Sequence, residues 1–401
     1  MEVIVLVREL GHHQKYLWRA KDALNTLDTR SAERRELLGE ILRIAELHDR
    51  AEKYIRRSVS VFLFLLLSLQ ERTKAFDMKS FPIFLVLVSA SLFLSCQRDP
   101  VGPKPVEINY HFATIPEGQQ LILANTEYYD KLTQYDLDWK ARKAGATLDE
   151  LKAIAQTCIQ DFSKEEKAVI DEAVGYVEDK LAAMGALSLP FPDHDIVFIK
   201  TNMMEEGDAA AAYTHKTEIY LYERVMKREP DYVHRIIAHE LFHCLTRNSP
   251  DFRRKMYELI GFHILDEDID FAPSIRELIL SNPDVEHLDN YATFTINGEK
   301  RDCALLTLYT ATWEEAYAEA GEDVDFFDYS QTVLVPIEAL DTWYPTEEAS
   351  DFWDVVGKNT DYVDAPEECM ATNFSFAVVD GTKKDYESPW LIEKMIALLK
   401  Q

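Results

Sequence analysis

The chain has 401 residues, of which 47% are hydrophobic, and a formal net charge of −28 at pH 7. The negative charge lies after residue 96, because residues 97–401 hold 28 basic and 59 acidic residues, a net charge of −31. The hydrophobic content is that of a globular protein with a proper core. A surface this acidic repels nucleic acid and anionic lipid headgroups, so the composition argues against a nucleic-acid-binding protein.

An apolar segment at residues 81–95 lies between Met78-Lys79 and Cys96. A positive start, a short apolar core and a small residue before a cysteine resemble a bacterial lipoprotein signal peptide over residues 78–96. The resemblance implies cleavage before Cys96, a lipid on its sulfur, and a place in the bacterial cell envelope, on the outer membrane or the periplasmic side. The alternative is a transmembrane anchor, but the segment is shorter than the roughly 20 apolar residues that span a bilayer.

Residues 1–77 precede this signal, although signal peptides stand at the true N-terminus. We therefore expect Met78 to be the start and residues 1–77 to be an upstream extension of the gene. One alternative is a genuine helical segment, since residues 30–57 are rich in helix formers. Another is a membrane hairpin built from the apolar runs at 59–69 and 81–95.

After the signal, residues 97–115 contain three prolines and are predicted to be a tether. A domain is expected over residues 116–401, with a helical part at 116–185. Helices are predicted at about 118–133 and 148–160, followed by a helix that begins at a capping box from Ser163 to Glu166 and ends at Gly185.

The remaining part, residues 186–401, alternates irregularly between strand and helix patterns. Asp231 is predicted to cap one of these helices, and Asn297-Gly298 to form a hairpin turn. The mixture predicts an α+β fold with a mixed or antiparallel sheet. The expected strands are 196–199, 209–213, 217–222, 291–296, 303–309 and 332–336, and the expected helices are 232–247, 250–261, 351–356, 367–376 and 389–399.

The helix at 232–247 contains His239-Glu240-Leu241-Phe242-His243, an HExxH motif. Side chains four residues apart lie on one helix face, so both imidazoles can reach one tetrahedral zinc ion. Glu240 can then lie beside the zinc-bound water as a general base. The alternative is a buried helix with two hydrogen-bonded histidines.

A catalytic zinc site needs a third protein ligand, and two later acidic segments offer one. The first contains Glu367 and Glu368. The second contains Glu315 and Glu319, which are four residues apart on one predicted helix face. Histidine ligands are disfavoured, because His263 lies beyond a helix stop and His234 points about 140° away from the zinc face.

The motif resembles the zincin metallopeptidases, and more narrowly the group whose third ligand is a glutamate on a later helix. A longer resemblance, over roughly residues 185–380, is to uncharacterised bacterial envelope lipoproteins with a zinc-binding metallopeptidase domain. The segments that carry it are 212–214, 239–247, 326–329, 356–360 and 366–374.

The resemblance implies a zincin-like fold and a Zn²⁺ site in which Glu368 joins His239 and His243. Thr372 stands where the family usually has an acidic residue that holds a ligand histidine, so Thr372 or Asn373 is expected to do this. The family also pairs an extended peptide with a strand edge beside the metal helix. Here that edge is expected at Ala212 and Tyr213.

Three further residues have expected roles. Tyr362, six residues before Glu368, is predicted to donate a hydrogen bond to the developing oxyanion; the alternative is a packed tyrosine at a helix start. Cys244 and Cys369 are interpreted as small buried residues behind the site, with a disulfide between them as the alternative.

Together these observations predict a zinc-dependent metallohydrolase, a peptidase that is anchored to the envelope through Cys96 and cleaves amide bonds of a peptide or protein substrate. One alternative is a non-catalytic envelope binding lipoprotein with a structural or vestigial zinc. Another is a zinc amidase that acts on cell-wall peptide. The sequence indicates no specificity pocket.

Overall fold

The computed structural model describes residues 106–186 and 188–401. The expectations for residues 1–77, for the signal at 78–96 with Cys96, and for residues 97–105 of the tether lie outside the described residues. Within the described part of the chain, no helix combines the length and apolar character needed to cross a bilayer.

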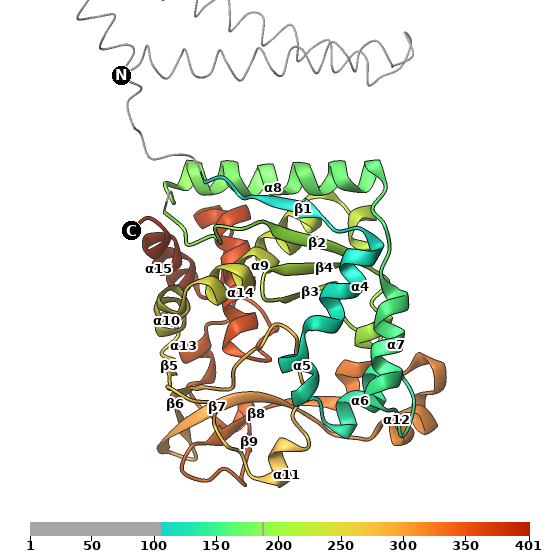
Figure 1. Cartoon of the computed structure of the whole chain (residues 1–401). Helices are drawn as coiled ribbons and strands as arrows, with labels where there is room; N and C mark the ends of the chain where they lie inside the picture. The colour runs from blue at the N-terminus through green and yellow to red at the C-terminus, as the bar shows by residue number, and fades with distance from the viewer. Residues whose placement is uncertain (1–105, 187) are drawn as a thin grey trace, which may run out of the picture. The chain divides into compact units, whose positions relative to one another are not determined.

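A mixed sheet of four strands forms the upper half of the unit in Figure 1. Its order is β1 (Tyr110–Phe112), β2 (Ile196–Thr201), β4 (Glu218–Tyr222) and β3 (Ala212–His215). The first three strands run parallel, and β3 runs antiparallel to β4 at the edge of the sheet.

The strand β1 corrects the expected tether at 97–115. Tyr110 to Phe112 pair with Ile196 to Phe198 of β2, and the preceding side chains of Val106 and Ile108 are buried. β1 has only three residues, and its partner strand lies some 85 residues later in the sequence. Such a short strand leaves no periodic pattern in the sequence. The packed chain therefore begins before residue 115.

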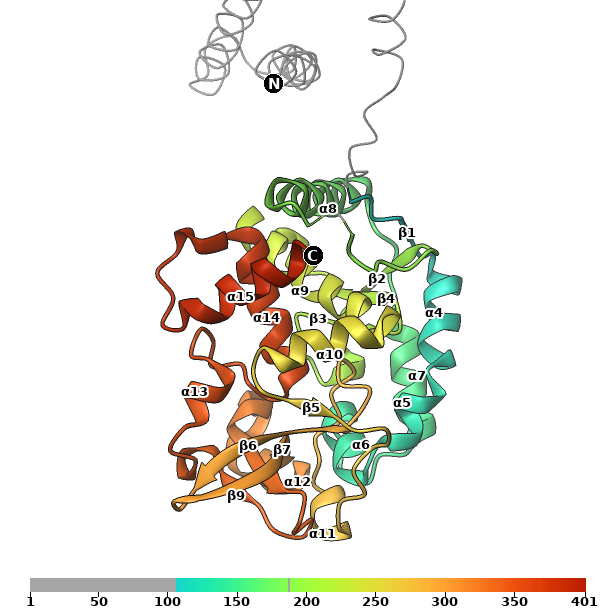
Figure 2. The same cartoon turned by 90° about the vertical axis from the view of Figure 1, so that its left-hand side faces the viewer.

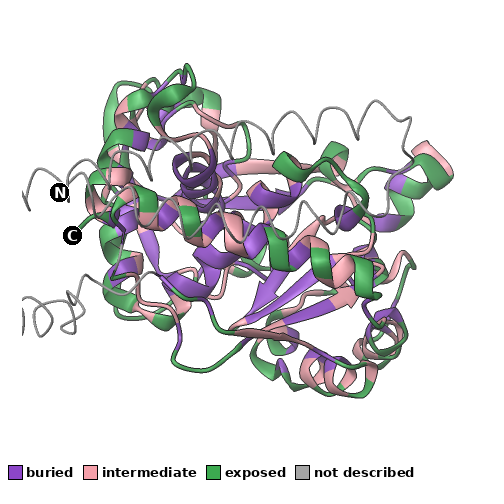
Figure 3. Ribbon diagram, turned by 90° about the horizontal axis from the view of Figure 1, so that it is seen from above, coloured by how far each residue is buried: buried purple, intermediate pink, exposed green. Residues whose placement is uncertain are grey.

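Helices cover both faces of this sheet (Figure 1). Ile196 and Phe198 of β2 join a core with α8 (Lys164–Met184) and α9 (Pro230–Asn248). Ile199, on the opposite face, packs in a second core with residues of α4 (Ile115–Ala124) and α7 (Leu148–Cys158). The alternation follows from the two-residue period of a strand, and Figure 3 shows the buried residues in the strands and on the inner helix faces.

Helices occupy most of residues 115–184, and their bounds differ in part from the expected ones. Ser163 and Glu166 form the predicted capping box of α8, and Gly185 ends the helix with a φ of 87°. The helix expected at 118–133 breaks at Asn125, whose side chain donates to the carbonyl of Leu121. Its second half is α5 (Thr126–Lys131), and a helix that was not predicted, α6 (Gln134–Ala141), begins at a capping box on Thr133.

The lower half in Figure 1 holds an antiparallel sheet in the order β5 to β9. Its long hairpin is confirmed: Asn297 and Gly298 both have positive φ, as a type I′ turn requires. The strands are β5 (His263–Ile264), β6 (Asn290–Ile296), β7 (Glu299–Tyr309), β8 (Ser330–Pro336) and β9 (Tyr344–Pro345).

The helix with the HExxH motif, α9, packs against α8 and α14 (Pro366–Val379), as Figure 2 shows. It begins at Pro230 with Glu229 as its cap, so the cap predicted at Asp231 was wrong by two residues. Proline favours the first position of a helix because that position needs no backbone N–H donor. The other helices are α10 (Pro250–Glu258), α11 (Pro273–Arg276), α12 (Trp313–Ala320), α13 (Phe352–Val356) and α15 (Pro389–Leu399).

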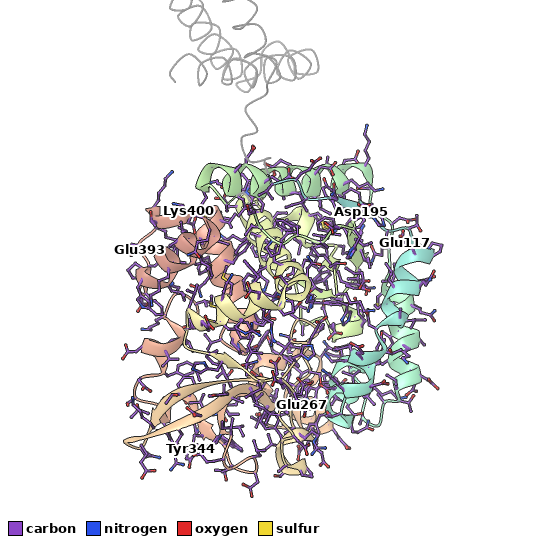
Figure 4. All side chains as sticks on the ribbon, turned by 60° about the vertical axis from the view of Figure 1, so that its left-hand side comes forward. Glu117, Asp195, Glu267, Tyr344, Glu393 and Lys400 are labelled. Atoms are coloured by element: carbon purple, nitrogen blue, oxygen red, sulfur yellow. The ribbon has the colours of Figure 1, made fainter. Side chains whose placement is uncertain are left out.

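Charged side chains lie on the periphery of the unit. Asp195, Glu267, Glu393 and Lys400 are exposed, and Figure 4 shows them on different sides of the ribbon. Three buried carboxylates, by contrast, lie where α9 and α14 face each other, those of Glu240, Glu367 and Glu368. The observed architecture is α+β with one mixed and one antiparallel sheet, as predicted.

Candidate metal centre

The two histidines of the HExxH motif project from the same face of α9. Their ring centroids are 4.9 Å apart. The side chain of His239 is 15% exposed, whereas that of His243 is fully buried. This is the arrangement expected of side chains one helical turn apart on a face that points into the molecule.

Glu368, in the first turn of α14, reaches both histidines. Its Oε2 lies 3.0 Å from Nε2 of His239 and 3.9 Å from Nε2 of His243. The donor atoms of a tetrahedral zinc ion, with bonds of about 2.0–2.1 Å, lie about 3.3 Å from one another. The three atoms are therefore spaced so that one cation can bridge them.

The free nitrogen of His243 is the strongest sign that the residues fit a metal ion. Nε2 is buried and has no hydrogen-bond partner among the described residues. Burial by itself lowers the pKa of His243, but the carboxylates of Asp284, Glu367 and Glu368 outweigh it and raise the pKa to about 10. The surroundings thus favour a positive charge at this point.

Glu367 fixes the orientation of His243. Its Oε1 accepts hydrogen bonds from Nδ1 of His243 (3.0 Å) and from the hydroxyl of Thr246 (2.6 Å), and its Oε2 accepts from Tyr257 (2.6 Å). Burial raises the pKa of Glu367, but these hydrogen bonds outweigh it and hold the pKa below its usual range. Because Nδ1 donates to a carboxylate, Nε2 is the nitrogen that can give up its proton and bind a cation beside Glu368.

A loop from the middle of the chain completes the surroundings. Asn282 donates to Oε1 of Glu368 at 2.7 Å. Asp284 lies 3.8 Å from Nε2 of His243 and accepts hydrogen bonds from the backbone and hydroxyl of Thr214. The sequence analysis missed both residues and the role of Glu367. The loop lies between short elements, and its Asn-Pro-Asp sequence signals only a turn.

Glu240 is buried beside the two histidines. Its Oε2 has no hydrogen-bond partner among the described residues, and its carboxylate groups with His243 and Asp284. Burial, followed by the charge of Asp284, raises the pKa of Glu240 well above its ordinary value. A buried carboxylate in this state is a competent proton acceptor once a cation offsets the surrounding negative charge.

The structure also separates the two residues expected to hold a ligand histidine. The hydroxyl of Thr372 lies 3.4 Å from Nδ1 of His239, whereas Asn373 bonds to Asn359 and to the carbonyl of Cys369. Thr372 is thus the neighbour of His239, and Asn373 is not. Tyr362 lies at the same end of the site, with its ring centroid 6.5 Å from that of His239.

The alternative ligands lie elsewhere. Glu315 is exposed and accepts hydrogen bonds from Thr312 as the capping box of α12. His234 bonds to Glu172 at 2.9 Å, and His263 is an exposed residue of β5. The cysteines of the described part of the chain are free and buried, so the alternative disulfide does not form; they are Cys158, Cys244, Cys303 and Cys369.

The strand β3 stands at the sheet edge, as the resemblance implied. The N–H of Tyr222 bonds to the carbonyl of Ala211, so the alternating antiparallel pattern directs Ala212 and Thr214 toward the free edge. Asp284 already accepts the N–H of Thr214. Tyr213 points into the core, where it stacks on Tyr220 at 4.6 Å, so Ala212 is the residue that offers its backbone to a partner.

Comparisons with known proteins add no relative. No family model, no curated protein and no solved structure matches this chain.

Proposed function

We propose that this chain is a zinc-dependent metallohydrolase, and specifically a peptidase, with His239, His243 and Glu368 as the metal ligands. The observation that carries the proposal is the buried set of three converging donor atoms with the unpartnered carboxylate of Glu240 beside them. A purely structural pair of histidines would not need a buried nitrogen without a partner, because such an atom destabilises the fold.

The donor set favours zinc over other common cations. Magnesium and calcium prefer oxygen ligands, whereas two imidazole nitrogens and one carboxylate oxygen suit zinc. Structural zinc sites are closed by four protein ligands, commonly cysteines, and catalytic sites keep one position open. Three ligands without cysteine therefore support the catalytic alternative.

When bound, zinc supplies a Lewis acid that makes a water molecule acidic near neutral pH and polarises a carbonyl group. Glu240 accepts the proton of the attacking water and later gives it to the leaving amine. Glu367 holds His243 in position through Nδ1. Tyr362 donates a hydrogen bond to the oxygen that gains negative charge, and the backbone of Ala212 pairs with an extended substrate.

Attachment to the bacterial envelope through a lipid on Cys96 is part of the same proposal. It is supported by the sequence of residues 78–96 alone.

A second candidate function has one observation in its favour. Asp284 lies 3.8 Å from Nε2 of His243, so a small movement would make it a fourth ligand and close the site. The chain would then be an envelope binding protein with a structural zinc. The two candidates differ in the role of Glu240, which is essential only for hydrolysis.

The test uses the full chain and its Glu240→Gln variant. We expect both proteins to bind one zinc ion per chain, as elemental mass spectrometry would measure. The variant should hydrolyse a panel of casein, small peptides and cell-wall peptides at least 1,000-fold more slowly than the unchanged chain. Glu315→Gln, which changes an exposed glutamate of α12, is the control and should keep full activity. An unchanged rate in Glu240→Gln would overturn the mechanism, and zinc binding without hydrolysis of any substrate would favour the structural alternative.

A further inference from the structure

A pocket opens beside the metal centre, and aromatic side chains form much of its wall. We call it the aromatic pocket. Four of its aromatic residues come from α6, from α12 and from the 3-10 helix η4 (Phe326–Tyr329). They are Trp139, Trp313, Phe326 and Phe327.

The aromatic pocket shares residues with the metal centre. Asn282, which holds Glu368, and Asp284, which lies near His243, both line it. Tyr362 and Ala212 line it as well. A substrate strand that pairs with the backbone of Ala212 and has its scissile carbonyl at the metal ligands therefore lies close enough to place a neighbouring side chain in this pocket.

The wall of the aromatic pocket is built from rings that support one another. The ring of Trp139 lies 5.3 Å from that of Trp313 and 5.9 Å from that of Phe326, both edge to face. Phe326 in turn contacts Phe327 at 5.5 Å. Such packing keeps the rings in place before a ligand arrives, which reduces the entropy lost on binding.

Phe327 is the residue whose exposure the fold does not explain. Phe327 is 54% exposed, although its neighbour Phe326 packs against a buried aromatic cluster that contains Trp139 and Trp313. A large apolar side chain at the mouth of a concave site often marks a binding surface.

The charged groups around the pocket disfavour a charged ligand. Lys140 is buried in an ion pair with Glu206, and the guanidinium of Arg142 lies over the ring of Trp313 at 5.3 Å. Lys140 is therefore not free for an acidic side chain, Arg142 is held against Trp313 and the carbonyl of Gly207, and Asp284 and Asp364 would repel an acidic group. Asp284 is itself engaged by Thr214, which leaves it poorly placed to attract a basic side chain.

We propose that the aromatic pocket binds an aromatic or large aliphatic side chain next to the scissile bond, so the enzyme selects peptides by one bulky apolar residue. The inference rests on the proposed function, because it places that residue relative to the metal centre.

The test measures the binding of small probes to the full chain loaded with zinc. The probes are the hydroxamates of N-acetylated phenylalanine, leucine, alanine, glutamate and lysine, titrated by calorimetry. We expect the phenylalanine and leucine probes to bind at least tenfold more tightly than the alanine probe, and the glutamate and lysine probes to bind no more tightly than alanine.

Two variants assign the preference to the aromatic pocket. Phe327→Ala should reduce the ratio of phenylalanine to alanine affinity to threefold or less. Because Phe327 is exposed, the substitution should leave folding intact. Trp343→Ala removes an aromatic residue that is 40% exposed and lies outside the pocket, and it should keep the full ratio.

A metal-free series separates this inference from the proposed function. The matching N-methylamides lack a zinc-binding group, and the fluorescence of Trp139 and Trp313 reports their binding in the presence of a chelator. A preference for phenylalanine that survives here supports the pocket even if zinc does not bind and the proposed function fails. Equal affinity for phenylalanine and alanine in both series, or a preference for glutamate or lysine, would overturn the inference even if the hydroxamates bind through zinc.

Discussion

In the described part of the chain, three groups of histidine and carboxylate atoms are close enough to hold a metal ion. Two of them share His243 at the metal centre, and the third is a separate, second cluster with different surroundings. At the metal centre, His239, His243 and Glu368 converge in the interior, and Nε2 of His243 has no partner. In the second cluster, His287 and Asp268 are half exposed, Asp268 pairs with Lys131, and Asp289 forms a bidentate pair with Arg253.

The difference teaches that proximity of donor atoms does not by itself make a metal site. In the second cluster, protein cations already neutralise the carboxylates, and water solvates His287. At the metal centre, Arg247 lies 3.8 Å from Asp284, but among the described residues the carboxylates of Glu240, Glu367 and Glu368 form no ion pair with a lysine or an arginine. The cost of a buried donor without a partner is the quantity that distinguishes the two clusters.

The largest expected effect compares one histidine from each cluster. His243→Ala should reduce zinc affinity by at least 100-fold, because it removes a ligand, whereas His287→Ala should leave it within twofold. Competition with a chromogenic chelator measures both. Equal losses in the two variants would show that the comparison between the clusters is wrong.

A smaller effect is expected from the residue that orients His243. Glu367→Gln should reduce zinc affinity by about 10–100-fold, the usual range for loss of a partner behind a ligand. Asp289→Asn provides the matched change in the second cluster and should alter stability alone. If Glu367→Gln binds zinc normally, its contact with His243 does not position the ligand.

A substitution of Glu218 tests whether a buried oxygen without a hydrogen-bond partner is sufficient for a metal site. Its Oε2 is buried without a partner, and burial raises its pKa to about 7. The folded state therefore holds more protons than the unfolded state, so stability falls as pH rises from about 4.5 through 7. Glu218→Gln should remove this dependence and stabilise the protein by about 1–3 kcal/mol at pH 8, as thermal unfolding across pH would measure, without a change in zinc affinity.

The smallest effect concerns His239. The hydroxyl of Thr372 lies 3.4 Å from Nδ1, a long and weak contact. Thr372→Val should therefore change zinc affinity by no more than about threefold, and Thr372→Asp should increase it, because a charged acceptor holds an imidazole more firmly. Zinc titration of the unchanged chain and of the two variants measures these affinities. A large loss of zinc affinity in Thr372→Val would show that the contact holds His239 firmly despite its length.

Features encoded by neighbouring residues could be predicted from the sequence. The capping box at Ser163, the stop at Gly185 and the Asn297-Gly298 turn depend on a few residues each, and the structure has all three. The helical face that brings His239 and His243 together follows from their spacing alone. The meeting of Glu368 with that face depended on a family resemblance, because nothing near Glu368 in the sequence points to α9.

Features that depend on distant contacts were missed for a physical reason. Asn282 and Asp284 reach the metal centre from a loop 34 and 36 residues after the last residue of α9, Asn248. A loop has no periodicity that would reveal what it contacts. Glu367 was considered a substitute for Glu368, but adjacent residues on a helix point about 100° apart. One therefore faces the metal position while the other faces the back of His243.

The hydrogen bond from the backbone of Thr214 to Asp284 limits how a peptide can dock. It leaves Ala212 as the residue of β3 whose backbone N–H and carbonyl groups can both pair with an incoming strand. A peptide gains little affinity from main-chain pairing along such a short edge, so the length of the peptide adds little to its recognition. If the chain is the peptidase proposed above, short peptides should be cleaved nearly as well as long ones, and turnover should depend on a single residue of the substrate.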